Sequence, residues 1–194
     1  MPAKKDDPEV VNLPGLAVDG VQLRLVGTSP LIVHKWSEKA KRQMLDKQMK
    51  KASQGKEAKN PEVDYRESLY IREDGSYGFP AVGFKAAAVR AGTYCDMKMV
   101  FLRGAFHVEG DLVKIDGEPK MREDMVRVGM GTADIRYRPE FSEWSTTLQV
   151  VYNSRALAVE QIVNLFEVAG FAVGVGEWRP EKDGQFGRFR VESH

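Results

Sequence analysis

The richest source of chemistry in this chain is a stretch near its C-terminus, GVGEWRPEKDGQFGRFRV, which spans residues 174–191. Its four glycines and three arginines surround a single tryptophan. Glycine costs backbone entropy and leaves no side chain to pack, so such a cluster needs a physical reason. One reason is a tight turn, and another is a loop whose main chain lies close against a phosphate group. Four glycines exceed what one turn requires, and we therefore favour a phosphate-binding loop.

An aromatic ring accompanies the cations of this loop, a combination typical of surfaces that bind single-stranded nucleic acid. Trp178 can stack on a base, which is worth about 1–3 kcal/mol, or it can hold the loop on the preceding helix, and both alternatives stay open. From this loop we predict the following nucleic-acid-binding residues: Gly174, Gly176, Trp178, Arg179, Gly184, Gly187, Arg188 and Arg190.

Four cationic residues from the middle of the chain extend this predicted surface. Lys85 lies at the start of an alanine-rich helical pattern, where its charge adds to the positive end of the helix dipole and can hold an anion. Arg90 follows on the same pattern, and Arg136 and Arg138 interleave with aromatic residues in RYRPEFSEW (residues 136–144). The alternative is a solvated helix face and a loop that folds back on a sheet.

Two residues, His34 and Asp46, are candidates for catalysis. Cleavage of RNA by general acid and base needs a proton acceptor near the 2′-hydroxyl and a donor near the leaving oxygen. His34, however, is flanked by apolar residues, which favours a packed histidine and a protein that is not an enzyme. No two of the three histidines have the spacing of metal ligands, and the single cysteine, Cys95, excludes a multi-cysteine zinc site, so we expect neither metal nor cofactor.

The composition of the 194 residues, 42% hydrophobic and 29% charged, allows one domain with a core. The sequence has no apolar run of membrane-spanning length and no secretory signal, and one cysteine fits a reducing compartment, so we expect a cytoplasmic protein. The net charge of +1 hides an uneven distribution, because residues 35–59 hold nine basic residues against three acidic ones. That segment is either a solvated helix and linker or an arm that lies along nucleic acid.

Hydrophobic periodicity predicts the elements that must position these residues. We expect strands at 21–26, 68–71, 99–108, 147–152 and 186–191, helices at 37–51, 82–94 and 158–169, and a hairpin within 111–128 that turns at Asp116-Gly117. This order predicts an α+β, ferredoxin-like (RRM-like) β-α-β-β-α-β core with a helix and linker inserted after the first strand and a hairpin inserted after the second. The expected organisation is an N-terminal tail or arm at 1–20 and a single domain at 21–194, with insertions at about 35–65 and 109–145.

Two segments of the chain resemble motifs of the RAMP superfamily of CRISPR-associated proteins. In FPAVGFKAAAVRA (residues 79–91) a proline, small residues, a lysine and an arginine match that superfamily's helix start, through Pro80, Gly83, Lys85 and Arg90. The stretch GVGEWRPEKDGQFGRF is similar to its glycine-rich loop, which opens with G-x-G and closes with G-aromatic-G-arginine. The chain departs from the pattern at Gln185, which separates Gly184 from the aromatic residue.

The resemblance implies a protein most like the backbone subunit that coats a guide RNA, or a phage-borne relative of it. Its expected partners are RNA or single-stranded DNA, further copies of itself in an oligomer or filament, and other CRISPR-type subunits. Some RAMP proteins are ribonucleases that use a histidine after the first strand, and related backbone subunits that cut RNA use an aspartate in this region, which implies a role for His34 or Asp46. A third possibility is a subunit mimic that binds protein and blocks an assembly, with which the low net charge agrees.

Overall fold

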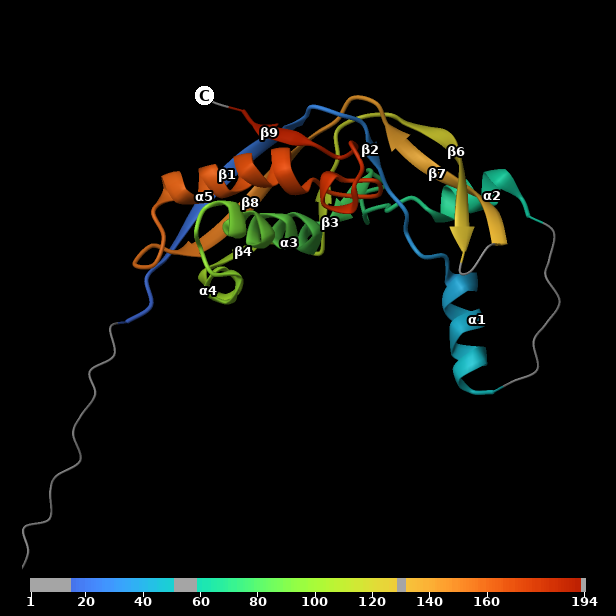
Figure 1. Cartoon of the computed structure of the whole chain (residues 1–194), viewed down its shortest axis with the longest axis horizontal. Helices are drawn as coiled ribbons and strands as arrows, with labels where there is room; N and C mark the ends of the chain where they lie inside the picture. Colours follow the sequence, from blue (N-terminus) through green and yellow to red (C-terminus); the bar gives the residue numbers. More distant parts are fainter. Residues whose placement is uncertain (1–14, 51–58, 129–131, 193–194) are drawn as a thin grey trace, which may run out of the picture.

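The computed structural model describes residues 15–50, 59–128 and 132–192, which form helices and antiparallel sheets (Figure 1). The largest sheet contains β1 (Val18–Gly27), β4 (Phe106–Val108), β8 (Ser145–Asn153) and β9 (Phe189–Val191), in the order β4-β8-β1-β9. Every neighbouring pair in it is antiparallel. Leu23, Leu148 and Val150 are buried on one face, whereas Gln22 and Gln149 are exposed on the other, which is the alternation of a sheet covered on one side.

Helices cover the apolar face of this sheet (Figure 1). They are α3 (Ala81–Ala91) and α5 (Val159–Val168), with the shorter α4 (Met99–Ala105) beside α3. Aromatic rings fill the space between the layers, because Phe106 of β4 packs edge-on against Phe166 of α5 at 6.1 Å and Phe84 of α3 packs against Phe189 of β9 at 5.9 Å. Each such ring contributes roughly 1.5–3 kcal/mol when it is fully buried.

A second group of elements lies at the other end of the molecule (Figure 1). The long strands β6 (Pro119–Val128) and β7 (Thr132–Phe141) pair with each other, and β2 (Leu31–Ile32) adds to β7. Two short strands, β3 (Gly78–Pro80) and β5 (Leu112–Lys114), form a separate pair. The helix α2 (Pro61–Glu67) packs on β7, whereas α1 (Glu38–Gln48) extends away from the rest of the fold (Figure 1). Short helical turns complete the chain at η1 (Gly92–Tyr94), η2 (Ala169–Val173) and η3 (Pro180–Lys182).

Most of the predicted elements are confirmed with boundaries within three residues. These are the first strand, the helices now described as α1, α3 and α5, and the strands β8 and β9. The chain turns at Asp74-Gly75, where Gly75 has φ of +79° and the Arg72 N–H donates to the Ser76 carbonyl. The predicted strand at 68–71 is reduced to a single bridge between Ile71 and Tyr77.

The predicted strand at 99–108 is wrong over most of its length, since residues Met99–Ala105 form the helix α4 and only Phe106–Val108 are extended. Leu102 and Ala105 are both buried and lie three residues apart, which is a helical spacing. A short apolar run such as this one fits a helix or a strand, so periodicity alone does not decide between them. The Leu102 side chain packs against Gly92, since a Cβ atom added to Gly92 would lie 2.2 Å from Cδ1 of Leu102. Tertiary packing on the end of α3 therefore decides the conformation of this segment.

The predicted hairpin turn at Asp116-Gly117 is also wrong. Asp116 bridges to Ser145 of β8, while β5 pairs with β3 and β6 pairs with β7. The β6–β7 pairing continues for ten residue pairs, from Pro119 opposite Phe141 to Val128 opposite Thr132. Residues 129–131, which connect β6 to β7, lie outside the described residues, as do residues 1–14 of the predicted tail and residues 51–58 of the basic segment.

In the part of the chain that the structure describes, none of the helices is both long and apolar enough to span a bilayer.

Candidate nucleic-acid interface

The glycine-rich stretch at 174–188, here called the ribbon, leads from η2 to β9 and folds back on itself. Its two limbs are joined by the Val175 N–H, which donates to the Gly187 carbonyl at 3.0 Å. The ribbon is also attached to β2 and to the residue before it, because the Gly187 N–H donates to the Pro30 carbonyl at 2.7 Å and the Glu177 N–H donates to the Ile32 carbonyl at 2.9 Å. These hydrogen bonds fix the ribbon on the main body.

The backbone conformation of the ribbon requires its glycines. Gly174, Gly176 and Gly187 have positive φ angles of +69°, +77° and +66°, and a Cβ atom on Gly184 would lie 1.8 Å from the Trp178 carbonyl oxygen. Most N–H groups of the ribbon already donate within the protein, at positions 174, 175, 177, 182, 183, 184, 186, 187 and 188. The geometry therefore favours close backbone packing, and binding of phosphate by this ribbon depends on its side chains.

One carboxylate draws two of the predicted arginines together. Glu181 pairs with Arg90 of α3, and its Oε2 atom accepts from Nε of Arg179 at 3.0 Å. Arg179 also donates from Nη1 to the Gly176 carbonyl at 2.9 Å. Burial, together with the charge of Arg90, lowers the pKa of Arg179 from its ordinary value. These side chains border a hollow of about 240 Å³ between α3 and the ribbon.

Lys85 is not part of this cluster. Gly83, Ala87 and Arg90 of α3 line the hollow beside the ribbon, and Lys85 projects from the opposite side of the helix, because residues two positions apart are about 200° apart around it. The Nζ atom of Lys85 lies 2.9 Å from Nδ1 of His107 on β4. Burial lowers the pKa of Lys85 from its ordinary value. Lys85 and the ribbon therefore do not form one groove.

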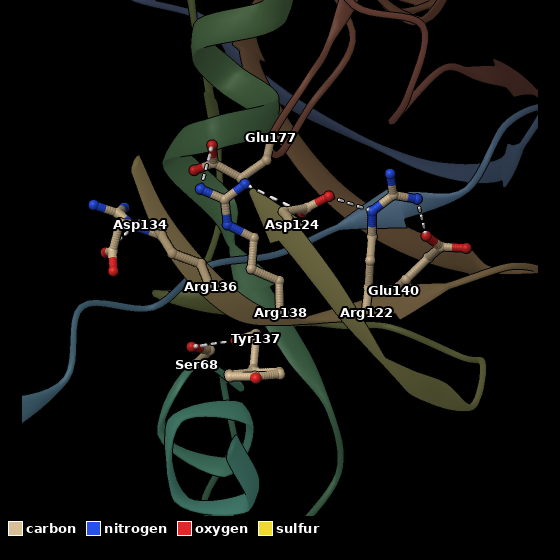
Figure 2. A network of polar contacts seen from close by, with 9 residues as sticks. All are labelled: Ser68, Arg122, Asp124, Asp134, Arg136, Tyr137, Arg138, Glu140 and Glu177. Carbon is tan, nitrogen blue, oxygen red and sulfur yellow. Dashed lines mark hydrogen bonds and ion pairs between the residues drawn. The ribbon is translucent and has the colours of Figure 1, made fainter. Parts of the chain in front are cut away.

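The two arginines predicted from residues 136–144 have different environments (Figure 2). Arg138 is 4% exposed and lies between two acidic residues, with Asp124 of β6 at 3.3 Å and Glu177 of the ribbon at 3.9 Å. Arg136 is partly exposed and its Nε atom lies 3.7 Å from Asp134. Arg138 thus joins the hairpin to the ribbon, whereas Arg136 stands at the surface.

Trp144, which the sequence places among the surface aromatics, is a core residue. Its side chain is 4% exposed, and Nε1 donates to the Ser29 carbonyl at 2.9 Å. The ring packs against Phe84 of α3 and Phe189 of β9. Strand alternation gives no sign of this burial, because Trp144 lies just before β8 and outside it.

His34, the first catalytic candidate, lies where the chain leaves β2. It borders a second hollow of about 240 Å³ together with Lys35, Lys59, Arg136 and Tyr137. Its Nδ1 atom is buried without a hydrogen-bond partner in the described part of the chain. Burial and the nearby Arg138 lower the pKa of His34 from its ordinary value, so the ring is neutral at pH 7.

Asp46, the second catalytic candidate, lies on α1 and does not line this hollow. His107 pairs with Lys85 as described above, and His194 lies outside the described residues. Within residues 15–50, 59–128 and 132–192, no group of three or more His, Cys, Asp or Glu side chains is arranged to hold a metal ion.

The remaining predicted residues lie on two surfaces. Trp178 and Arg188 border a third hollow, of about 560 Å³, on the side of the ribbon that faces residues 28–30. Arg190 is exposed on β9, opposite Val26, on the face of the large sheet that α3 and α5 leave open.

Three residues near the third hollow were not among the predicted nucleic-acid-binding residues: Arg122, Gln185 and Phe186. The Arg122 guanidinium lies 4.9 Å from the centre of the Phe186 ring and pairs with Asp124 at 2.8 Å and Glu140 at 2.7 Å (Figure 2). The position of Phe186 among glycines could have drawn attention to it. Nothing in the sequence connects it to Arg122.

The fold and the site define an α+β protein with antiparallel sheets, in which arginine and aromatic side chains gather around a glycine-rich ribbon. Among solved structures, it is similar to Cmr6 from Pyrococcus furiosus, with a TM-score of 0.46 and 11% identity over 92% of this chain and 100% of that one. It is also similar to a Cas6 product complex, with a TM-score of 0.29 and 15% identity over 89% of this chain and 51% of that one. No protein-family model matches the sequence, and no curated protein does.

Proposed function

We propose that this chain is a non-enzymatic protein of the RAMP/CRISPR backbone type that binds RNA or single-stranded DNA and assembles side by side along the strand. The observation that carries the proposal is the third hollow, where Trp178 and Arg188 lie on one side of a rigid ribbon. An aromatic face that stacks on a base and a positively charged groove beside it are the two components of single-strand recognition.

The strand order supports a ferredoxin-like core for this proposal. In chain order the elements β1, α3, β4, β8, α5 and β9 give β-α-β-β-α-β. In the sheet, β1 lies between β8 and β9, which are the third and fourth strands of that series, and β4, the second strand, is at the edge. The split βαβ arrangement has this order of strands.

Further cations surround the ribbon. Arg136 and Lys35 border the hollow beside His34, and Arg90 and Arg179 border the hollow beside α3. Phosphate groups that bind such side chains release counterions, so the affinity for a strand falls as the salt concentration rises. RNA or single-stranded DNA, further copies of this chain and other CRISPR-type subunits are the proposed partners.

Fluorescence anisotropy with a labelled single-stranded RNA, repeated over a series of salt concentrations, tests this function. The double variant Lys35→Ala, Arg136→Ala should weaken binding and reduce the slope of log affinity against log salt by about 1.4, because each cationic side chain that neutralises a phosphate of a single strand adds roughly 0.7 to that slope. The matched control is Arg103→Ala, Arg155→Ala, which removes the same charge from exposed positions on α4 and beyond β8. A DNA strand of the same sequence shows which nucleic acid is preferred.

Two results would contradict the proposal: no binding of either strand at low salt, or equal losses in the double variant and its control. Equal losses would mean that only the total charge matters. If neither strand binds, the remaining candidate is a subunit mimic that binds protein. The exposed apolar residues Met44 and Leu45 of α1 would then be the expected contact surface.

His34 supports RNA cleavage as a second candidate function. A neutral imidazole beside Arg136, Lys35 and Tyr137 can accept a proton from a 2′-hydroxyl while the cations hold the phosphate. Incubation of end-labelled RNA with the protein, first without and then with divalent metal, separates the two functions. Cleavage that His34→Ala abolishes would establish the nuclease, and intact RNA would remove it.

A further inference from the structure

The largest of the three hollows, about 560 Å³, lies between the ribbon and the turn at residues 28–30. The side chains that give it chemical character are Trp178, Gln185, Phe186 and Arg188. Its volume lies within the range of pockets that hold small organic molecules, about 300–1,000 Å³. None of its described lining residues is acidic, so the hollow does not repel a ligand that carries phosphate groups.

Trp178 is held in this position against its own backbone preference. Its φ angle of +54° lies in the left-handed region, which costs a non-glycine residue about 1–2 kcal/mol. The Phe186 N–H, which donates to the Trp178 carbonyl at 3.0 Å, and the close approach of Gly184 maintain the conformation. Trp178 is nevertheless 43% exposed, so the strain does not bury the residue. Strain of this kind, at an exposed aromatic residue beside a hollow, indicates a site for a ligand.

Arg188 has one hydrogen-bond donor without a partner in the same place. Its main-chain N–H donates to Oγ of Ser29 at 3.0 Å, but its Nε atom is buried without an acceptor in the described part of the chain. A buried donor without a partner costs about 1–3 kcal/mol, which a ligand with a suitable acceptor recovers. Gln185, exposed beside it, offers both an amide donor and an amide acceptor.

Phe186 completes the wall of the hollow and is fixed from behind. The Arg122 guanidinium covers its ring at 4.9 Å and is itself held by Asp124 and Glu140. This cation–π contact orients the ring and contributes about 0.5–1 kcal/mol. The hollow is therefore formed before a ligand arrives.

We propose that this hollow holds one nucleobase of the bound strand, stacked on Trp178, with its polar edge hydrogen-bonded to Arg188 and Gln185. The inference rests on the proposed function and deepens it, since it assigns the hollow to a base, whereas the phosphates contact the surrounding arginines. A base is the part of a nucleic acid that combines a flat aromatic face with an edge of donors and acceptors, and both sets of partners are present here.

Intrinsic tryptophan fluorescence tests this assignment directly. The background variant is Trp36→Phe, which removes the other exposed indole and leaves the buried Trp144 as a constant signal. A single-stranded RNA should quench Trp178, and an RNA of the same length made of abasic nucleotides should bind without quenching it. Trp178→Ala should weaken binding of the normal strand by roughly 5- to 150-fold, the equivalent of one stacked base, and should leave binding of the abasic strand unchanged.

Phe171→Ala is the matched control, because Phe171 is an exposed aromatic residue of η2 that does not line the hollow. It should leave the affinity for both strands unchanged. Adenosine and guanosine monophosphates, titrated alone, distinguish a base of the strand from a free nucleotide: they should quench Trp178 only at concentrations far above those at which the strand does so.

The outcomes separate this inference from the proposed function. If the strand binds by anisotropy while Trp178 emission is unchanged and Trp178→Ala binds normally, the base site is refuted and strand binding stands. If a free mononucleotide binds as tightly as the strand, the hollow is a nucleotide site and the assignment to the strand is refuted. If no strand binds at all, both proposals fail together.

Discussion

Glu181 controls how much of the cationic surface is open to a ligand. Its carboxylate pairs with Arg90 and with Arg179, and Arg138 is held in a buried network with Asp124. A phosphate group would compete with Glu181 for the same two guanidinium groups. The carboxylate therefore weakens binding of any polyanion at this point.

Glu181→Gln should consequently tighten the binding of single-stranded RNA at low salt. Removal of a partly exposed carboxylate that pairs with two arginines is worth about 0.4–1 kcal/mol, which corresponds to roughly twofold to fivefold in affinity. Fluorescence anisotropy measures the change, with Glu109→Gln as the control because Glu109 is exposed and carries the same charge. An equal gain in both variants would show that only the net charge matters, and weaker binding by Glu181→Gln would show that the pairing itself forms the binding surface.

The surroundings of a residue are predictable where neighbours along the chain determine them, and much less so where distant residues do. The positive φ angles at Gly174, Gly176 and Gly187 agree with the turns that the glycines of this stretch indicate. The burial of Arg138 depends on Asp124 from the opposite strand and on Glu177 from the ribbon, two partners that no local pattern reveals. The same holds for Lys85, whose distance from the ribbon depends on which face of α3 packs inward.

At the scale of elements, the ribbon is the feature that most constrains the sequence. Gly187 has φ of +66°, and a Cβ atom on it would lie 1.8 Å from the Val175 carbonyl oxygen on the opposite limb. That oxygen cannot move away without breaking the hydrogen bond between the two limbs, because Val175 donates to the Gly187 carbonyl. The glycine is therefore required by the fold of the ribbon, whether or not a ligand binds.

Gly187→Ala should lower the free energy of unfolding by about 2–4 kcal/mol, or the melting temperature by roughly 5–15 °C, because it adds left-handed strain to a steric clash. Gly104→Ala is the control, since Gly104 lies in α4 and a methyl group there would meet nothing within 4 Å outside its own helix turn. That substitution should be neutral or stabilise the protein by up to about 1 kcal/mol through helix propensity. Thermal unfolding followed by circular dichroism compares the two, and a Gly187→Ala protein as stable as the Gly104→Ala protein would contradict the close packing of the ribbon.

Elements with a strong hydrophobic period are predictable from the sequence, whereas pairings between strands are not. The α5 helix and the β8 strand follow directly from their patterns, since Ile162, Leu165 and Phe166 share one face and Leu148 and Val150 alternate with polar residues. The α4 helix escapes prediction because its short, largely apolar run fits either conformation. The β6–β7 register escapes it because the turn signal Asp116-Gly117 does not join paired strands: Asp116 bridges to Ser145 of β8 instead.

At the scale of the whole molecule, exposed apolar side chains gather on the elements that extend from the body. The helix α1 and the β6–β7 hairpin carry exposed Leu45, Met121, Met125 and Ile135, with Met125 78% exposed. The α1 helix extends away from the body, and the hairpin lies at the same end of the molecule (Figure 1). Apolar side chains on such extensions are typical of surfaces that contact another protein. This arrangement supports the proposed assembly of neighbouring copies along one strand.

Assembly of this kind predicts that the mass of the complex grows with the length of the RNA. Light scattering after size-exclusion chromatography should show more protein copies on longer strands, and Leu45→Glu combined with Met125→Glu should stop the growth while a short strand still binds with unchanged affinity, because neither residue lines the hollow beside Trp178. The matched control, Val100→Glu with Phe101→Glu, places the same charges on exposed apolar residues of α4. Growth that both double variants abolish would reflect charge alone. A fixed mass on every strand length would mean that the chain binds nucleic acid as a single unit, with its apolar extensions directed to a different protein.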